Sequence, residues 1–241
     1  MSKPFSDLGI NKHLQQALAH LEISVPTDIQ EKTIPLVLNQ SEDLVVVAKT
    51  GTGKTVAFGV PLLQLIDIQN PNVQVVILAP TRELGQQIHA NLVAYASENP
   101  SISMASVCGG IPIKPQIERL KTPTHIVVAT PGRLVDLVKR GAINLKQLAS
   151  LVLDEADEMV SALKQDLDLI IKEIPKSRRT LLFTATLSGA IKQLVQNYMS
   201  KHVIQIEADM KTVGHQGIDH HYVVVEPIEK LNVLMHFLSS K

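Results

Sequence analysis

The sequence is poor in aromatic residues and cysteine, and it has no long apolar run. With three tyrosines, four phenylalanines and no tryptophan, its core must be built from Val, Ile, Leu and Ala. The single cysteine, Cys108, cannot form an internal disulfide, so nothing demands an oxidising compartment. Apolar runs such as residues 44–48 reach about five residues, whereas a membrane span needs about 20. Because residues 1–7 also lack the apolar segment of a secretory signal, we expect a cytoplasmic protein with no membrane partner.

An excess of charge of one sign is lacking too. The chain carries 23 basic and 23 acidic residues among 241, and 45% of its residues are hydrophobic. This composition excludes bulk disorder, collagen-like chains and coiled coils. Zero net charge argues against nucleic-acid binding by a global positive field, so such binding would depend on local donors. The densest basic cluster, residues 172–179, is predicted to be a solvated loop rather than a binding patch.

Short β-branched apolar runs alternate with stretches of helical spacing. Most runs are apolar at consecutive positions, which is typical of strands buried on both faces of a parallel sheet. The alternation predicts an α/β fold, an open and mostly parallel sheet with helices on both faces. The predicted strands are 44–48, 73–79, 102–108, 125–129, 151–153, 180–183, 203–206 and 222–225, and the predicted helices are 54–68, 82–97, 131–140, 157–174 and 188–200.

Two segments lie outside this alternation. Residues 1–39 are predicted to be helical at 11–21 and 27–39, with a break or a new first turn at Pro35. The main domain then covers 40–207, and the polar stretch 208–219 is predicted to be a linker. The tail at 220–241, one strand and a helix at 228–238, is too short to bury a core. We expect this tail to be the start of a truncated second domain.

A glycine-rich turn follows the first strand and opens a helix. It fits the phosphate-binding P-loop, with Ala in the first glycine position. Glycines let backbone N–H groups turn toward phosphate oxygens, and the helix N-terminus adds a favourable dipole. Lys54 would reach the β- and γ-phosphates and the Thr55 hydroxyl would bind Mg²⁺, whereas the alternative is a turn without a ligand. The turn comprises Ala48, Lys49, Thr50, Gly51, Thr52, Gly53, Lys54 and Thr55.

An acidic motif ends the strand at 151–153. Asp154 is expected at the carboxyl edge of the sheet beside the P-loop, where it can hold Mg²⁺. Glu155 is then suited to orient or deprotonate a water that attacks the γ-phosphate. The alternative is an acidic helix N-terminus stabilised by the dipole, which Asp157 partly fits. Pairing with a P-loop in one sheet favours the functional interpretation.

Four further turns each follow an apolar strand directly. The carboxyl ends of strands in an open parallel sheet point one way, so these turns line one edge together with the P-loop. Their arginines, hydroxyls and glycine N–H groups suit a phosphodiester backbone and carry no base-edge code. The alternative is ordinary turn chemistry. The turns are Pro80, Thr81, Arg82 and Glu83; Gly109 and Gly110; Thr130, Pro131, Gly132 and Arg133; and Thr184, Ala185 and Thr186.

In order and spacing, these motifs together with Pro26–Gln30 resemble the N-terminal half of a DEAD-box ATP-dependent RNA helicase over residues 3–207. The resemblance implies a RecA-like P-loop NTPase domain that binds ATP, Mg²⁺ and RNA and works with a C-terminal RecA-like domain. It assigns Lys54, Thr55 and Asp154 to the phosphates and Mg²⁺, and Glu155 to catalysis. It also implies adenine recognition by Phe5, Thr27 and Gln30, RNA backbone contacts by the turns at Pro80, Gly109 and Thr130, and coupling of hydrolysis to strand separation by Asp157, Thr184, Ala185 and Thr186.

The sequence departs from the family pattern in several places. Ile23 stands where an aromatic residue usually lies near adenine, Asp28 replaces a usual Pro, and Thr184 replaces a usual Ser. The pair Leu163-Lys164 replaces a usual Gly-Phe. The arginine-bearing motifs of a second domain are missing, and an arginine finger is worth about 10³–10⁵ in rate. We therefore expect the chain alone to bind nucleotide, hydrolyse it very slowly and not unwind RNA.

Two other functions stay open at this point. One is a standalone nucleic-acid-binding module with a degenerate nucleotide site, which Ile23 and Leu163-Lys164 would favour. The other is a P-loop kinase of a small molecule, which the acidic motif and the lack of a recognisable lid or acceptor pocket disfavour. Cys108 is expected to be a small buried hydrophobe. His215, His220 and His221 lack the spacing of a zinc site.

Overall fold

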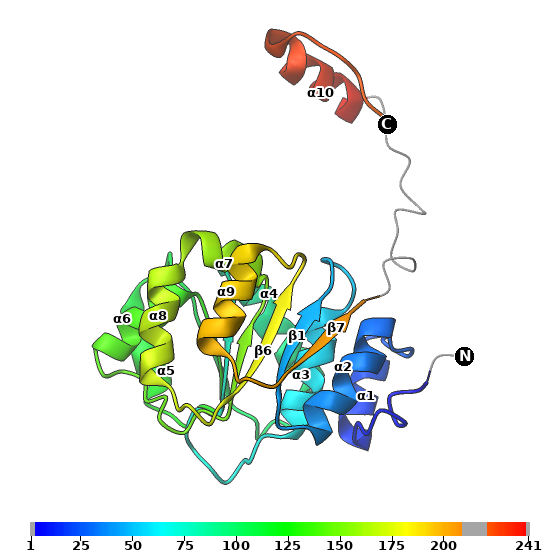
Figure 1. Cartoon of the computed structure of the whole chain (residues 1–241). Coiled ribbons are helices and arrows are strands. Elements are labelled where there is room, and N and C mark those ends of the chain that lie inside the picture. The colour runs from blue at the N-terminus through cyan, green and yellow to red at the C-terminus, as the bar shows by residue number, and fades with distance from the viewer. Residues whose placement is uncertain (1–2, 209–220, 240–241) are drawn as a thin grey trace. The chain divides into compact units, whose positions relative to one another are not determined.

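The computed structural model describes residues 3–208 and 221–239, which belong to two separate units of the chain (Figure 1). The first unit is built on a seven-stranded sheet with the order β3-β4-β2-β5-β6-β1-β7, in which every pair of neighbours is parallel. The predicted open parallel sheet is therefore confirmed. The strands are β1 (Asp43–Val47), β2 (Val75–Leu78), β3 (Met104–Val107), β4 (Ile126–Ala129), β5 (Ser150–Leu153), β6 (Arg179–Thr184) and β7 (Val203–Glu207).

Helices cover both faces of this sheet, as predicted (Figure 1). Consecutive strand residues point to opposite faces, so Leu44 and Val46 of β1 join one core cluster and Val45 joins the other. This is why the strands are apolar at consecutive positions. The first cluster packs against α1 (Lys12–His20), α2 (Asp28–Asn39), α3 (Lys54–Gln64) and α4 (Arg82–Tyr95), and the second against α5 (Ile113–Leu120), α6 (Pro131–Lys139), α7 (Ala156–Ala162), α8 (Lys164–Glu173) and α9 (Gly189–Tyr198).

The N-terminal helices share the core of the sheet. Leu14 of α1 and Ile29 of α2 are buried in the same cluster as β1. The predicted break at Pro35 is wrong, because α2 runs through it from Asp28 to Asn39. Proline removes one helical N–H and crowds the preceding turn. Here Ile34 and Val37 are both buried on the core, so tertiary packing holds the helix together across that defect.

The basic cluster at 172–179 is a solvated loop only in part, and the two arginines that end it correct that prediction. Arg179 begins β6 and donates from Nη1 to the carbonyl oxygen of Val37 at 2.8 Å, from Nη2 to that of Leu36 at 3.1 Å and from Nε to that of Glu42 at 2.7 Å. It thereby satisfies carbonyls at the end of α2. Arg178 donates to the carbonyl oxygen that ends α9 at 2.8 Å. Sequence alone could not show these partners, which lie far away along the chain.

Three further elements differ from the expected ones. The single helix predicted at 157–174 is two helices, α7 and α8, which meet at Leu163, whose side chain packs against the core. Helix α5 was missed, although its apolar positions 113, 117 and 120 fall on one helical face. In the second unit, the helix predicted at 228–238 appears as η1 (Pro227–Glu229) and α10 (Lys230–Ser239). No strand forms at 222–225, where Tyr222 and Val224 are exposed and lack a neighbouring strand among the described residues.

The remaining expectations concern Cys108, a histidine metal site and a membrane-spanning helix. Cys108 is buried and free, as expected of a small hydrophobe. His215 and His220 lie outside the described residues. Within the described ranges no three His, Cys, Asp or Glu side chains gather as a metal site would require. No described helix combines the length and the apolar character that crossing a bilayer takes.

We predict that Arg179→Leu lowers the free energy of unfolding by about 2–3 kcal/mol, because it leaves three carbonyls of the α2–β1 connection without a charged donor. Arg140→Leu is the control, because Arg140 only pairs with Asp136 one helical turn away on an exposed surface. Such pairs contribute about 0.5 kcal/mol or less. Urea denaturation of the three proteins measures both effects. Equal midpoints for Arg179→Leu and Arg140→Leu would refute the capping role.

Candidate functional site

The sheet order places the two predicted phosphate motifs side by side. The P-loop follows β1 and the acidic motif follows β5, and only β6 lies between these strands. Since all three strands are parallel, their carboxyl ends meet at one edge. This brings Lys54, at the start of α3, to within 3.4 Å of Asp154, measured from Nζ to Oδ1.

Glycines shape the P-loop. Gly51 and Gly53 have φ angles of 79° and 90°, which residues with a Cβ rarely adopt. A Cβ on Gly53 would also collide with the side-chain amide of Gln30. Inside the loop, the Thr52 hydroxyl donates to the carbonyl oxygen of Lys49 at 2.8 Å. The turn is therefore held by its own bonds before any ligand arrives.

Two of the three residues expected to recognise adenine, Thr27 and Gln30, contact the backbone of the P-loop. The Thr27 hydroxyl donates to the carbonyl oxygen of Thr52 at 2.9 Å, and the Gln30 amide donates to that of Gly53 at 3.1 Å. The Gln30 side-chain oxygen in turn accepts from the backbone N–H of Thr27 at 3.0 Å. Phe5 is buried in the core. In this structure Thr27 and Gln30 tie the start of α2 to the P-loop.

The pair formed by Lys54 and Asp154 is almost completely buried. Their side chains are 6% and 3% exposed, respectively. The Lys54 ammonium has no hydrogen-bond partner among the described residues, although its charge faces the carboxylate. Burial raises the pKa of Asp154, and the charge of Lys54 opposes that rise. Burying an ammonium without hydrogen bonds is costly, so the site favours an added group that accepts them.

Glu155 sits in a strained conformation beside this pair. Its φ and ψ angles are 52° and 50°, left-handed values that are uncommon outside glycine. Such strain concentrates where the surrounding structure must aim a side chain. The Glu155 backbone N–H donates to Oδ1 of Asp154 at 3.0 Å. Burial raises the pKa of the Glu155 carboxyl, against the influence of the Lys54 charge.

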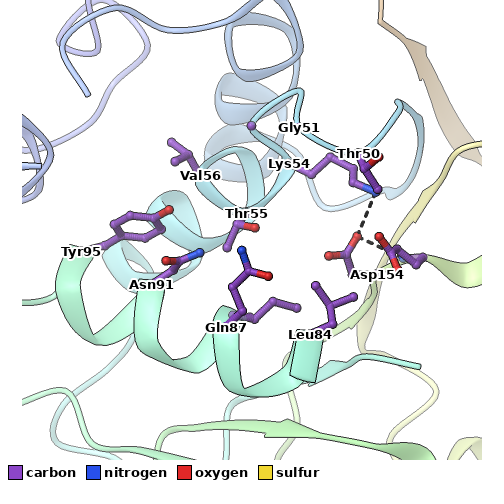
Figure 2. Close-up of a pocket in the computed structure, with 13 residues that line it drawn as sticks. Thr50, Gly51, Lys54, Thr55, Val56, Leu84, Gln87, Asn91, Tyr95 and Asp154 are labelled. Atoms are coloured by element: carbon purple, nitrogen blue, oxygen red, sulfur yellow. Dashed lines mark hydrogen bonds and ion pairs between the residues drawn. The ribbon is translucent and has the colours of Figure 1, made fainter. Parts of the chain in front are cut away.

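A cavity of about 370 Å³ joins these groups. One wall is the P-loop with Lys54 and Thr55, and Asp154 and Glu155 also line it. The facing wall is α4, which sequence reasoning had not assigned to this site. Figure 2 shows its side chains Leu84, Gln87, Asn91 and Tyr95 directed toward the P-loop side of the cavity. Their spacing along 82–97 is the signal that could have found them, a helical stripe that is partly polar.

The turns predicted to contact RNA meet at the other half of the same edge. Arg82 donates from Nη1 to the carbonyl oxygen of Gly110 at 3.1 Å. The backbone N–H of Gly109 donates to the Thr130 hydroxyl at 3.0 Å, so this N–H is not free for a phosphate, contrary to expectation. Arg133 joins this group because its Nη2 donates to the carbonyl oxygen of Ile111, the residue after Gly110, at 2.9 Å.

The remaining residues of these turns start helices. The Thr81 hydroxyl accepts from the backbone N–H of Leu84 at 3.3 Å and caps α4, which Pro80 precedes. Pro131 is the first residue of α6 and is buried. Gly132 lies in the first turn of α6, where a Cβ would come within 3.3 Å of a carboxylate oxygen of Asp166.

The predicted coupling residues form a short chain of hydrogen bonds beside the acidic motif. The Thr184 hydroxyl donates to the carbonyl oxygen of Thr186 at 2.9 Å. The Thr186 hydroxyl donates to Oδ2 of Asp157 at 3.4 Å. The end of β6 is thereby linked to the first turn of α7, with Ala185 exposed between the two threonines.

Departures from the family pattern are accommodated locally. Ile23 is half-buried against the first core cluster. Asp28 pairs with Lys32 at 2.9 Å in the first turn of α2. Leu163 ends α7 and packs on the second cluster without needing a positive φ angle.

Comparison with known proteins identifies what the chain is similar to. The model of the DEAD/DEAH box helicase family matches residues 27–194. An ATP-dependent RNA helicase (CshA) of Limosilactobacillus reuteri is 39% identical over 236 residues, covering 97% of this chain and 47% of that protein. A helicase of the same name from Listeria monocytogenes is 40% identical over 236 residues, covering 97% and 45%.

The structural comparison agrees. The crystal structure of a DEAD box protein from Methanococcus jannaschii has a TM-score of 0.82 and 35% sequence identity, covering all of this chain and 64% of that one. The chain spans about half the length of the curated relatives it matches. The family resemblance and the RecA-like fold predicted from the sequence are therefore confirmed.

We predict that Lys54→Met raises the pKa of Asp154 further above its ordinary value of 3.8, because the variant loses the charge that now opposes the effect of burial. An acid with a higher pKa in the folded than in the unfolded chain favours folding while it is protonated. The stability of Lys54→Met relative to the unchanged protein therefore falls as pH rises from the pKa of Asp154 in the unchanged protein, itself above 3.8, through the higher pKa in the variant. Lys121→Met, at an exposed position, is the control.

Carboxyl-carbon NMR titration of Asp154, in chelator and without nucleotide, measures the pKa directly. Urea denaturation between pH 4 and pH 8 measures the stability. A titration of Asp154 in Lys54→Met that matches the one in Lys121→Met would contradict this account of the pair.

Proposed function

This chain belongs to the DEAD/DEAH box helicase family, and on that premise we propose that it binds ATP with Mg²⁺ in the cavity beside Lys54 and RNA along the neighbouring turns. In the complete protein, ATP hydrolysis would drive the remodelling of RNA duplexes. The observation that carries the nucleotide assignment is the buried Lys54 ammonium, which faces the cavity without a hydrogen-bond partner among the described residues.

A triphosphate supplies what the Lys54 ammonium lacks. Its oxygens accept hydrogen bonds from an ammonium and from the backbone N–H groups of a P-loop, and the N-terminus of α3 contributes positive potential. Gly51 and Gly53 keep this approach clear of side chains. The cavity of about 370 Å³ has the size of a small-molecule site.

The oxygen groups of the cavity also fit a magnesium ion. Thr55 and Asp154 both line it, and the Thr55 hydroxyl has no hydrogen-bond partner in the described part of the chain. Hydroxyl and carboxylate oxygens are ligands that Mg²⁺ prefers, so Thr55 and Asp154 would hold the ion next to the phosphates. The bound ion would neutralise negative charge on the phosphate oxygens.

Glu155 has the properties of the group that handles the attacking water. It lines the same cavity, and its backbone is fixed by the bond to Asp154. A carboxyl whose pKa is raised by burial is a better proton acceptor at neutral pH than an ordinary one. In this proposal Glu155 orients the water and accepts its proton at a carboxylate oxygen.

The cavity holds too little positive charge for fast hydrolysis. Among the described residues, Lys54 is the only cationic side chain that lines it. Charge spreads over the phosphoryl oxygens in the transition state, and arginine fingers that stabilise it are worth about 10³–10⁵ in rate. We propose that a C-terminal RecA-like domain supplies this charge when it closes over the cavity.

The RNA-facing part of the proposal rests on Arg82 and Arg133. Arg82 begins α4 and Arg133 lies in the first turn of α6, both at the carboxyl edge of the sheet, and they are half-exposed beside Gly110 and Ile111. Each guanidinium keeps N–H donors that no described residue accepts, and such donors match phosphate oxygens. Contacts of this kind bind the RNA backbone without recognising its sequence.

We predict that a non-hydrolysable ATP analogue with Mg²⁺ raises the melting temperature of residues 1–241 in a saturable way, and that Lys54→Ala abolishes the shift. The Lys54 ammonium is buried, lines the cavity and has no hydrogen-bond partner in the described part of the chain. Lys121→Ala, which changes an exposed lysine paired with Glu118, should keep the full shift. Equal shifts in Lys54→Ala and Lys121→Ala would contradict the assignment, and no shift in the unchanged chain would favour a nucleic-acid module with a degenerate nucleotide site.

We also predict that the chain alone turns over ATP near background, with or without single-stranded RNA, because it lacks a second cation at the phosphates. Adding the C-terminal half of a full-length relative in trans, or fused after residue 241, should restore RNA-stimulated turnover. Phosphate release measured at saturating ATP gives both rates. Strong RNA-stimulated turnover by residues 1–241 alone would refute the requirement for a second domain.

A further inference from the structure

The turn that contains Gly109 and Gly110 is held from several sides by other elements. The N–H of Gly109 donates to the Thr130 hydroxyl, which precedes α6, and the carbonyl oxygen of Gly110 accepts from Arg82 at the start of α4. Gly110 itself needs its positive φ angle of 77°. These contacts and the φ angle of Gly110 restrict the backbone of the turn.

Gln116 holds the two residues on either side of the glycines, Cys108 directly and Ile111 through Arg133. Gln116 lies in α5 and is 5% exposed. Its side-chain nitrogen donates to the carbonyl oxygen of Cys108 at 3.0 Å, and its oxygen accepts from Nη1 of Arg133 at 2.6 Å. Nη2 of Arg133 reaches the carbonyl oxygen of Ile111 at 2.9 Å. The amide donates from its nitrogen to one partner and accepts at its oxygen from the other, which fixes the orientation of Gln116.

We propose that Gln116 is a positioning residue for RNA binding, which holds Arg133 and the turn at Cys108–Ile111 in the geometry that receives an RNA phosphate. The proposal rests on the RNA-binding part of the proposed function. Gln116 cannot touch the RNA itself because it is buried. It acts by removing the freedom of Arg133, whose remaining N–H donors then face the phosphate without having to be ordered at the moment of binding.

Arg82 and Arg133 thus both bind the backbone of the turn at Cys108–Ile111. Each guanidinium donates inward to a backbone carbonyl of adjacent residues, Gly110 and Ile111. The two positive groups are thereby held close together by the same short stretch of backbone. Their mutual repulsion is offset by the carbonyl oxygens between them and by the Gln116 oxygen on Arg133.

The experiment measures the affinity of residues 1–241 for a fluorescent single-stranded RNA oligonucleotide, with the ATP analogue and Mg²⁺ present. Gln116→Leu removes both hydrogen bonds, and we expect the dissociation constant to rise roughly threefold to tenfold. Gln116→Glu keeps an acceptor for Arg133 but loses the donor to the Cys108 carbonyl, so it should recover only part of the affinity. Binding of the ATP analogue, measured in parallel, should be unchanged in both variants because Gln116 is not part of the cavity.

Gln74→Leu is the matched control for loss of stability. Gln74 is a second buried amide, 7% exposed, whose side-chain nitrogen donates to the carbonyl oxygen of Asp67 at 2.7 Å. It precedes β2 and so lies at the opposite end of the strands from the RNA turns. Gln74→Leu should lower the melting temperature about as much as Gln116→Leu and leave the RNA affinity unchanged.

A double-mutant cycle with Arg133→Ala decides whether Gln116 acts through Arg133. If it does, Gln116→Leu with Arg133→Ala binds RNA no more weakly than Arg133→Ala alone. Should Gln116→Leu fail to fold, Gln116→Asn replaces it, because the shorter amide cannot reach both Cys108 and Arg133.

Three outcomes overturn the proposal in different ways. Additive losses in the cycle, or an equal loss in Gln74→Leu, would show that Gln116 only stabilises the fold. Unchanged affinity in Gln116→Leu or Gln116→Asn would remove Gln116 from RNA binding while leaving the proposed function intact. No RNA binding by the unchanged protein, with the ATP analogue bound, would instead overturn the RNA-binding part of the proposed function and this inference with it.

Discussion

The buried ion pair between Lys54 and Asp154 is the constraint on which the candidate site depends. Two opposite charges at 3.4 Å with almost no exposure are expensive to bury, and no described residue forms a hydrogen bond with the Lys54 ammonium that would offset that cost. The parallel sheet makes the pair possible, since β1 and β5 end at the same edge with only β6 between them. The arrangement suits the binding of a polyanion together with its metal cation. The polyanion would supply hydrogen-bond acceptors for the ammonium, and the cation would bind the carboxylate.

The fold was predictable because its strands are buried on both faces and separated by amphipathic helices. The predictions failed where distant partners override a local rule. Pro35 does not break α2, because Ile34 and Val37 anchor that helix on the core. Arg179 is half-buried because carbonyls at the end of α2, far back in the sequence, accept its N–H groups. A short window of sequence shows neither the core on which Ile34 and Val37 pack nor the carbonyls that bind Arg179.

The same distinction separates the site residues that were predicted from those that were missed. Lys54 and Asp154 stand in motifs whose spacing encodes their chemistry, so sequence was sufficient to pair them. The adenine role expected of Gln30 stays a prediction, whereas the contact of its amide with the P-loop carbonyl of Gly53 was not predicted, because it depends on how α2 packs on α3. Gln116 gave no signal at all, because its partners, Cys108 and Arg133, come from two other elements.

Helix α4 physically connects the two halves of the site. Its first residue, Arg82, holds the turn at Gly110, while Leu84, Gln87 and Tyr95 along the same helix form the wall of the cavity opposite the P-loop (Figure 2). A helix anchored in the core through Ile88 and Leu92 moves as a unit rather than residue by residue. A ligand that fills the cavity and displaces α4 therefore displaces Arg82 and the turn it holds. A second connection runs from Asp157 through Thr186 to Thr184 at the end of β6, so the acidic motif is linked to its surroundings through hydrogen bonds as well as through packing.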